Sequence, residues 1–180
     1  MGGVDKAVLQ VGGWSLLDTV LSAAAPLCSR LVVVGPRRAT TFEEAVFTLE
    51  AEPGGGPVPA VLAGLAEVAG ADEVFVLAAD LALLSSAGLQ RLLDELHGGR
   101  AEAAAAGDRG GRPHPLLAVY RADALAQAAG LLGENARDLP ASRLLPPVTV
   151  PVKLDAGQTL NVTTPADLAR AVLADQEDRA

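Results

Sequence analysis

The stretch Val74-Phe75-Val76-Leu77-Ala78-Ala79-Asp80 decides the fold, because six apolar residues run directly into one carboxylate. A short, wholly apolar run is typical of a strand that is covered on both faces of a sheet. A carboxylate that follows such a strand lies at the crevice where open α/β sheets bind their ligands. The stretch therefore predicts a buried strand that carries Asp80 into a binding site. The other interpretation of Asp80 is a cap for the next helix.

Helix and strand patterns alternate on both sides of this stretch. On the N-terminal side we expect a helix at 14–27, strands at 31–34 and 46–49, and a helix at 58–69. On the C-terminal side we expect a helix from Ser85 or Ser86 to Leu96, a strand at 115–120, helices at 121–132 and 139–145, a strand at 148–152, and a helix from Pro165 to about Asp175. This alternation predicts a parallel α/β sheet in a single domain, residues 1–180.

Composition excludes several classes of protein. The net charge is −8, which argues against a nucleic-acid binder, since such proteins neutralise phosphates with many Lys and Arg side chains. No apolar stretch reaches the ~18 residues of a membrane span. Cys28 is the only cysteine, so neither an internal disulfide nor a thiolate metal cluster is expected. These features predict a cytoplasmic enzyme-sized domain in which Cys28 is a small buried hydrophobe.

The chain begins with Gly2, Gly3 and, after two residues, Lys6, which leads into a predicted hydrophobic helix. Glycines let a phosphate approach the backbone closely, and successive N–H groups then hold its oxygens. A lysine adds a mobile positive charge. The segment indicates half of a phosphate-binding loop, and its other interpretation is a flexible chain start with a solvated lysine.

Met1 to Lys6 resembles the second half of the Leu-Ala-Gly-Gly-x-Ser-x-Arg-Met-Gly-Gly-x-Asp-Lys loop of molybdenum cofactor guanylyltransferases. Five further stretches resemble this family in the same order: Leu31-Val32-Val33-Val34, Gly54-Gly55-Gly56-Pro57 with Ala63-Gly64-Leu65, Val76 to Asp80, His114-Pro115-Leu116-Leu117-Ala118-Val119-Tyr120, and Asn161-Val162-Thr163-Thr164-Pro165-Ala166-Asp167-Leu168. The resemblance implies a three-layer α/β/α, Rossmann-like nucleotidyltransferase fold with a mostly parallel sheet. It also places a strand at 101–106, where alanine by itself favours a helix.

The resemblance implies an activity as well. Members of the family join GMP from GTP to the phosphate of molybdopterin and release pyrophosphate. By resemblance, Asp80 would hold Mg²⁺ and Lys6 would neutralise the triphosphate, so both are candidate catalytic residues. The implied partners are GTP, a molybdopterin-type substrate, and transient partners in molybdoenzyme maturation. Two alternatives stay open: a cytidylyl- or sugar-phosphate nucleotidyltransferase, and a non-catalytic relative that binds a nucleotide or a partner protein.

An acidic residue before the glycine-proline turn reads the guanine edge in the family. In this chain Glu50 or Glu52 holds that place, and the spacing does not choose between them; the other interpretation of each is an ordinary surface carboxylate. Gly56 and Pro57 would let the base approach the backbone, or simply form a turn. Ala60 stands where relatives often have a glycine.

On the acceptor side, the resemblance assigns Asn161 to the pterin. Thr163 replaces the family's second asparagine. This position therefore offers a hydroxyl for hydrogen bonding but lacks the amide. Arg137 resembles an arginine that binds the terminal phosphate of molybdopterin, and is otherwise a surface residue. Asp5 and His114 are interpreted as structural. His97 is expected to complement a helix dipole.

Two positions depart from the family pattern. Gly35 stands where some relatives have an asparagine that touches the nucleotide, so this contact is expected to be missing or supplied by Arg37 or Arg38. The family's first strand and Leu-Ala-Gly-Gly turn have no counterpart in the chain. We therefore expect two neighbouring strands to lack a row of hydrogen-bond partners, at about 1–3 kcal/mol for each buried orphan.

Overall fold

The computed structural model describes residues 5–108, 110–132 and 136–178. Gly2 and Gly3, and with them the glycines of the predicted phosphate loop, lie outside the described residues. In the described part of the chain, no helix combines the length and the apolar character that a membrane span requires.

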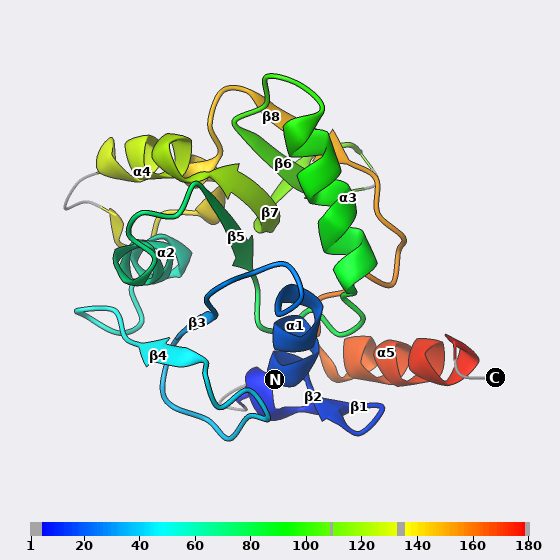
Figure 1. Ribbon diagram of the computed structural model, residues 1–180. Helices are drawn as coiled ribbons and strands as arrows, with labels where there is room; N and C mark the ends of the chain where they lie inside the picture. The colour runs from blue at the N-terminus through cyan, green and yellow to red at the C-terminus, as the bar shows by residue number, and fades with distance from the viewer. Residues whose placement is uncertain (1–4, 109, 133–135, 179–180) are drawn as a thin grey trace.

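A four-stranded sheet forms the centre of the molecule (Figure 1). Its strands are, in spatial order, β5 (Glu73–Leu77), β7 (Pro113–Arg121), β6 (Ala103–Gly107) and β8 (Thr149–Val152). β7 runs antiparallel to both neighbours, and β6 runs parallel to β8. Three of the four strands therefore point the same way. The strand predicted at 101–106 is confirmed as β6, because its four buried alanines pack between β7 and β8 on a sheet covered on both faces.

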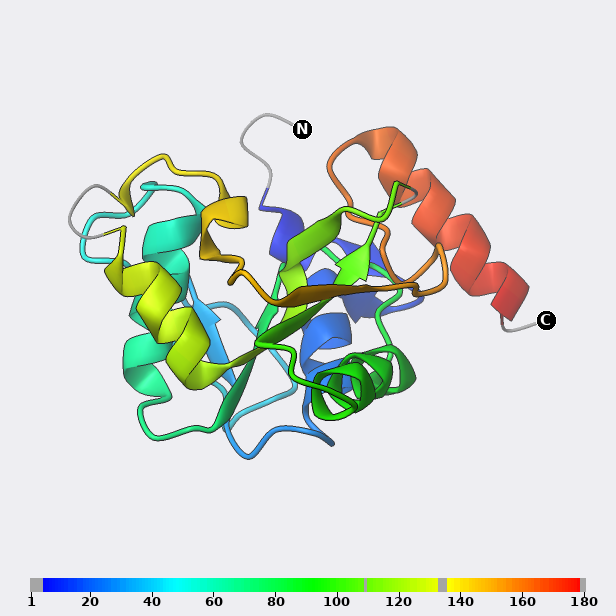
Figure 2. The same ribbon diagram turned by 90° about the horizontal axis from the view of Figure 1, so that it is seen from above.

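Alternating side chains of this sheet pack into two separate hydrophobic cores, one on each face. Ala104, Leu117 and Val119 pack with α1 (Leu16–Ala24) and α3 (Ser86–His97). On the opposite face, Ala103 and Tyr120 pack with α2 (Pro57–Glu67) and α4 (Ala122–Gly130). Figure 2 shows the strands between these two pairs of helices. The three-layer α/β/α arrangement expected from the sequence is confirmed.

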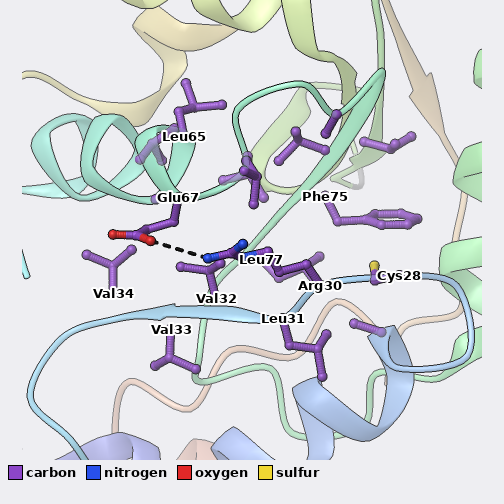
Figure 3. A pocket seen from close by; sticks show the side chains of 18 of the residues that line it. Cys28, Arg30, Leu31, Val32, Val33, Val34, Leu65, Glu67, Phe75 and Leu77 are labelled. Atoms are coloured by element: carbon purple, nitrogen blue, oxygen red, sulfur yellow. Dashed lines mark hydrogen bonds and ion pairs between the residues drawn. The ribbon is translucent and has the colours of Figure 1, made fainter. Parts of the chain in front are cut away.

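β3 (Val32–Val34) and β4 (Val46–Thr48) form a separate parallel pair, as their apolar runs predicted. β3 faces β5 across an apolar groove of about 700 Å³, which α1 and α2 also line. Figure 3 shows the side chains that point into it, with the ion pair of Arg30 and Glu67 (3.5 Å) above β3. Within the described ranges no strand joins β3 to β5. This is the break in the sheet that the missing family strand led us to expect.

The N-terminal segment differs from the helix predicted after Lys6. Lys6–Val8 forms a short 3-10 helix, η1, which is followed by β1 (Gln10–Val11) and β2 (Trp14–Ser15), an antiparallel pair. The turn between them uses Gly12 and Gly13 at φ 60° and 87°, where glycine is favoured. α1 begins only after Ser15, whose hydroxyl caps it by accepting the N–H of Asp18. The hydrophobic helix predicted directly after Lys6 is therefore wrong, and the helix predicted at 14–27 begins two residues later than expected.

The remaining elements follow the predicted order. η3 (Ala141–Leu144) is the short helix expected near 139–145, and α5 (Pro165–Asp178) is the last helix. α5 packs beside β1 at one end of the molecule (Figure 1). The segment before α5 runs back to the end of β5, where Leu81 and Asn161 form an isolated antiparallel bridge. That return places the C-terminal motif beside Asp80.

Candidate active site

Asp80 lies just beyond the carboxyl end of β5. The Ala78 N–H donates to the Leu116 carbonyl (2.7 Å), so pairing with β7 extends one residue past the strand. The Asp80 backbone carbonyl then accepts the N–H of Val162 (2.9 Å). The chain at Asp80 is thus fixed from both sides, and its carboxylate remains 19% exposed. An anchored and accessible carboxylate is suited to binding a charged ligand.

Lys6 and Asp80 form an ion pair, with Nζ donating to Oδ2 at 3.4 Å. They are 74 residues apart, and η1 carries Lys6 to the end of β5. The Asp5 carboxylate caps η1 by accepting the Ala7 N–H (3.2 Å). Asp5 also accepts a hydrogen bond from Arg38 Nε at 2.7 Å. That bond lowers the pKa of Asp5, against the opposing effect of burial. Asp5 has the structural role expected of it.

The two arginines after Gly35 are both engaged within the protein. Arg38 donates to Asp5 and to the Pro36 carbonyl (2.9 Å). Its guanidinium would lie 3.0 Å from a Cβ placed on Gly35, which is at φ 146°. The Arg37 guanidinium stands 5.4 Å from the centre of the Phe47 ring. Their predicted contact with a nucleotide would therefore compete with these interactions.

Asn161 and His114 meet beside Asp80. Asn161 Nδ2 lies 3.4 Å from His114 Nε2, across 47 residues of sequence. His114 is the second residue of β7, which runs antiparallel to β5, so it lies at the end of the sheet that carries Asp80. Burial lowers the pKa of the His114 imidazole, whereas its own backbone and the charge of Asp80 act the other way.

Two atoms of this pair are buried without a hydrogen-bond partner among the described residues: His114 Nδ1 and Asn161 Oδ1. Such atoms are rare in native proteins, and each costs about 1–3 kcal/mol. Sequence reasoning assigned His114 a structural role. The signal that was missed is the antiparallel direction of β7, which brings the start of that strand to the end of β5.

The glycine-proline turn forms a second group of predicted residues. Glu50 Oε2 accepts the Gly54 N–H (3.2 Å), so this carboxylate closes the turn. Gly56 is at φ 90° and precedes Pro57, the first residue of α2. A Cβ at Gly56 would lie 3.6 Å from the backbone of Asp138. That distance leaves room for a Cβ, so it is the positive φ, at which L side chains are strained, that favours glycine at position 56.

Arg137 lies with this turn. Its Nη1 pairs with Glu52 Oε2 at 3.5 Å, and both side chains are largely exposed. The next residue, Asp138, donates its N–H to the Gly55 carbonyl (2.8 Å). The structure thus brings Arg137 together with Glu52, one of the two predicted base-reading residues, and within the described ranges no hydrogen bond or ion pair joins it to Asn161. Glu52 is the freer of the two candidate carboxylates.

Thr163 has a structural contact of its own. Its hydroxyl donates to Asp167 Oδ2 at 2.8 Å, and its N–H donates to the same oxygen at 3.1 Å. Asp167 also accepts from Thr164 and forms an ion pair with Arg170, so it fastens the start of α5. A role of Thr163 in substrate binding stays a prediction, and it would share the hydroxyl with this network.

Two other residues discussed from the sequence lie away from this group. His97 pairs with Glu73 at the far end of β5 (2.8 Å). From the sequence we expected only an interaction of His97 with the helix dipole, and this partner was not predicted. Cys28 lines the groove between β3 and β5 and is half-buried, which raises the pKa of its thiol. In the described part of the chain, no cluster of three or more His, Cys, Asp or Glu side chains is arranged to hold a metal ion.

Comparison with known proteins places this chain in a family. A family model described as "MobA-like NTP transferase domain" matches residues 1–146. A probable molybdenum cofactor guanylyltransferase of Chloroflexus aggregans is 30% identical over 182 aligned positions, which cover 92% of this chain and 85% of that protein.

Solved structures share the fold. The 2-C-methyl-D-erythritol 4-phosphate cytidylyltransferase of Thermus thermophilus superposes with a TM-score of 0.73 at 23% identity, over 95% of this chain and 93% of the other. The molybdopterin-guanine dinucleotide biosynthesis protein A of Archaeoglobus fulgidus gives 0.72 at 22% identity, over 97% and 92%. Since the family model spans more than half of the sequence, this chain belongs to the MobA-like NTP transferase domains and is a nucleotidyltransferase.

Proposed function

We propose that this nucleotidyltransferase joins GMP from GTP to the terminal phosphate of a molybdopterin-type acceptor and releases pyrophosphate. The observation that carries the proposal is the pairing of Lys6 with Asp80 at the end of β5, with Asn161 on the adjoining segment. The relative from Chloroflexus aggregans, named as a probable guanylyltransferase for the molybdenum cofactor, supports this choice of substrates.

The proposed reaction does not need a general base. An oxygen of the acceptor phosphate attacks the α-phosphorus of GTP, and the bond from that phosphorus to the bridging oxygen of the β-phosphate breaks. The attacking oxygen is already an anion, so no proton has to be removed. Lys6 neutralises charge on the triphosphate and so favours departure of pyrophosphate, a case of electrostatic stabilisation in a preorganised site.

Asp80 fits a Mg²⁺ ion of the kind that phosphoryl-transfer sites use. Mg²⁺ in such sites takes one or two carboxylates and keeps several waters or phosphate oxygens. Asp80 could meet this need alone, because its Oδ2 pairs with Lys6 and its Oδ1 takes part in no hydrogen bond or ion pair within the described ranges. When bound, Mg²⁺ would supply positive charge that stabilises the triphosphate during transfer.

We assign the two substrates to two separate groups of residues. The glycine turn with Gly56, Pro57 and either Glu50 or Glu52 would receive the guanine, and Glu52 is favoured because Glu50 already accepts the Gly54 N–H. Asn161 and Thr163 would receive the acceptor. Arg137 would belong with the guanine, because it pairs with Glu52 and so compensates the charge of that carboxylate.

A transfer assay tests the proposal directly. Purified protein is incubated with Mg²⁺, molybdopterin, and GTP, CTP or ATP in parallel, and both pyrophosphate and the dinucleotide product are measured. We expect product with GTP at a rate well above that with CTP or ATP, and none without acceptor. If no product forms with any of the three nucleotides and any acceptor, the proposal is contradicted and the non-catalytic alternative is favoured.

A cytidylyltransferase is the second candidate function. It is suggested by the shared fold of the Thermus thermophilus cytidylyltransferase. The same assay with CTP and 2-C-methyl-D-erythritol 4-phosphate distinguishes the two. A higher kcat/KM for this pair than for GTP and molybdopterin would replace the guanylyltransferase proposal with the cytidylyltransferase one.

A further inference from the structure

The imidazole of His114 and the amide of Asn161 form a contact that the transfer chemistry does not use. We propose that His114 is a positioning residue: it holds the Asn161 side chain in the one orientation that binds the acceptor substrate. The substrate part of this inference rests on the proposed function. The geometric part concerns His114 and Asn161 alone.

The backbone of Asn161 is fixed independently of its side chain. Leu81 and Asn161 form a bridge, and this bridge is flanked by hydrogen bonds from the Val162 N–H to Asp80 (2.9 Å) and from the Ala82 N–H to Leu160 (3.1 Å). An amide group can still rotate on such a fixed backbone and exchange its donor and acceptor ends. In the described structure the partner that opposes this rotation is His114 Nε2.

The polarity of the contact follows from the atoms involved. Asn161 Nδ2 carries hydrogens and has no lone pair to offer, so His114 Nε2 must be the acceptor. The ring is then neutral, with its proton on Nδ1. Burial of the ring favours this neutral form. The contact therefore defines which end of the Asn161 amide is the donor toward His114.

Stability does not explain this pair. His114 Nδ1 and Asn161 Oδ1 are both buried and unpartnered among the described residues, so the contact leaves as many polar groups unsatisfied as it joins. An apolar ring of similar size at position 114 would remove one orphan and create another. We expect such a change to alter ligand binding far more than folding.

Steady-state kinetics of three variants test the inference. In His114→Phe we expect KM for the acceptor to rise about fivefold, as for loss of one hydrogen bond between uncharged groups. KM for GTP and the melting temperature should stay close to wild type. His114→Gln places a carbonyl acceptor on a side chain of similar reach. We expect its KM for the acceptor substrate to lie close to the wild-type value. His97→Phe, at the far end of β5, is the matched control and should change neither KM. An unchanged acceptor KM in His114→Phe, or no recovery in His114→Gln, would overturn the proposal.

A spectroscopic measurement separates this inference from the proposed function. The chain has two histidines, so the ¹⁵N resonances of both rings are assigned with the single variant His97→Phe. For the protein without substrate at neutral pH, we expect His114 to be neutral and protonated at Nδ1, and we expect Asn161→Leu to shift its Nε2 resonance. A proton on Nε2, or a resonance that Asn161→Leu leaves in place, would refute the positioning role. If the protein transferred no nucleotide at all, the proposed function would fail, and these resonances would still decide the His114–Asn161 contact.

Discussion

Asp80 is the residue on which the proposed chemistry most depends. Its backbone is held by Val162 and its carboxylate is paired with Lys6, which is 37% exposed. We predict that Asp80→Asn abolishes nucleotidyl transfer, because the amide keeps the shape of the side chain and removes the charge that would hold Mg²⁺. A pyrophosphate-release assay over a range of Mg²⁺ concentrations measures this loss.

Stability should respond very differently to the same change. A partly exposed ion pair is worth less than about 1 kcal/mol, so Asp80→Asn should move the melting temperature by only about 3 °C. Asp94→Asn, on the exposed side of α3, is the control and should leave both activity and stability unchanged. Full turnover in Asp80→Asn would mean that the charge of Asp80 is not needed for transfer; Asp80 is not the cap of α3, since that cap is Ser85.

Asp167 illustrates a carboxylate with a structural role. Hydrogen bonds from Thr164 and Thr163, followed by Arg170, hold its pKa far below the ordinary value of 3.8, against a smaller effect of burial. Because the folded-state pKa is depressed, its contribution to stability is complete above about pH 4 and is lost as the pH falls further.

We therefore predict a pH-dependent effect of Asp167→Asn. The variant should melt at a lower temperature than wild type at pH 7, and this difference should shrink as the pH falls below about 4. Melting curves at several pH values measure it. Glu177→Gln, an exposed change in the same helix, should show no such trend. A difference that stays constant down to pH 2 would place the stabilising charge elsewhere.

At the scale of secondary-structure elements, β5 pairs with β7 along one edge, and among the described residues no strand pairs with its other edge. Bonds from Ala78 to Leu116 and from Ala122 to Asp72 define the hydrogen-bonded pairs of the β5–β7 ladder. Since such pairs alternate along antiparallel strands, the N–H groups of Val74 and Val76 point to β7. Those of Phe75 and Leu77 point to the groove that separates β5 from β3.

We predict that this difference is visible in hydrogen exchange. The amides of Phe75 and Leu77 should exchange at least about tenfold faster than those of Val74 and Val76, because no described strand pairs with them. The comparison lies within one strand, so its intrinsic stability is the same for both sets. Equal protection of all four amides, measured by NMR, would show that the groove is closed in solution.

At the scale of the whole molecule, the two predicted substrate sides come from different parts of the chain. The glycine turn leads into α2, whereas Asn161 lies on the segment that returns to the end of β5 and pairs with Leu81. We predict that Asn161→Ala weakens binding of the acceptor about fivefold and leaves GTP affinity nearly unchanged. Calorimetry with each ligand separately measures the two affinities, and the control is Thr159→Ala, in the same segment, where the hydroxyl donates to the Ala156 carbonyl (3.2 Å). Equal losses for both ligands would place Asn161 between the substrates.

Much of the architecture was predictable from local patterns. The apolar run before Asp80, the glycine-proline turn before α2 and the proline at the start of α5 each indicated an element that the structure contains. The helix expected after Lys6 was wrong, because Gly12 and Gly13 favour a turn that local hydrophobicity does not reveal. The positions of Asp80 and Asn161 at one end of the sheet followed from the resemblance to known nucleotidyltransferases.

The sequence by itself determined the alternation of helices and strands and the family, since both depend on residues close together along the chain. Only the tertiary structure decided which side chains meet. The pairing of Lys6 with Asp80 spans 74 residues, and that of His114 with Asn161 spans 47. Such contacts depend on strand order and direction, above all on β7 running against β5. Strand order reflects the packing of two cores on one sheet, so no local pattern encodes it.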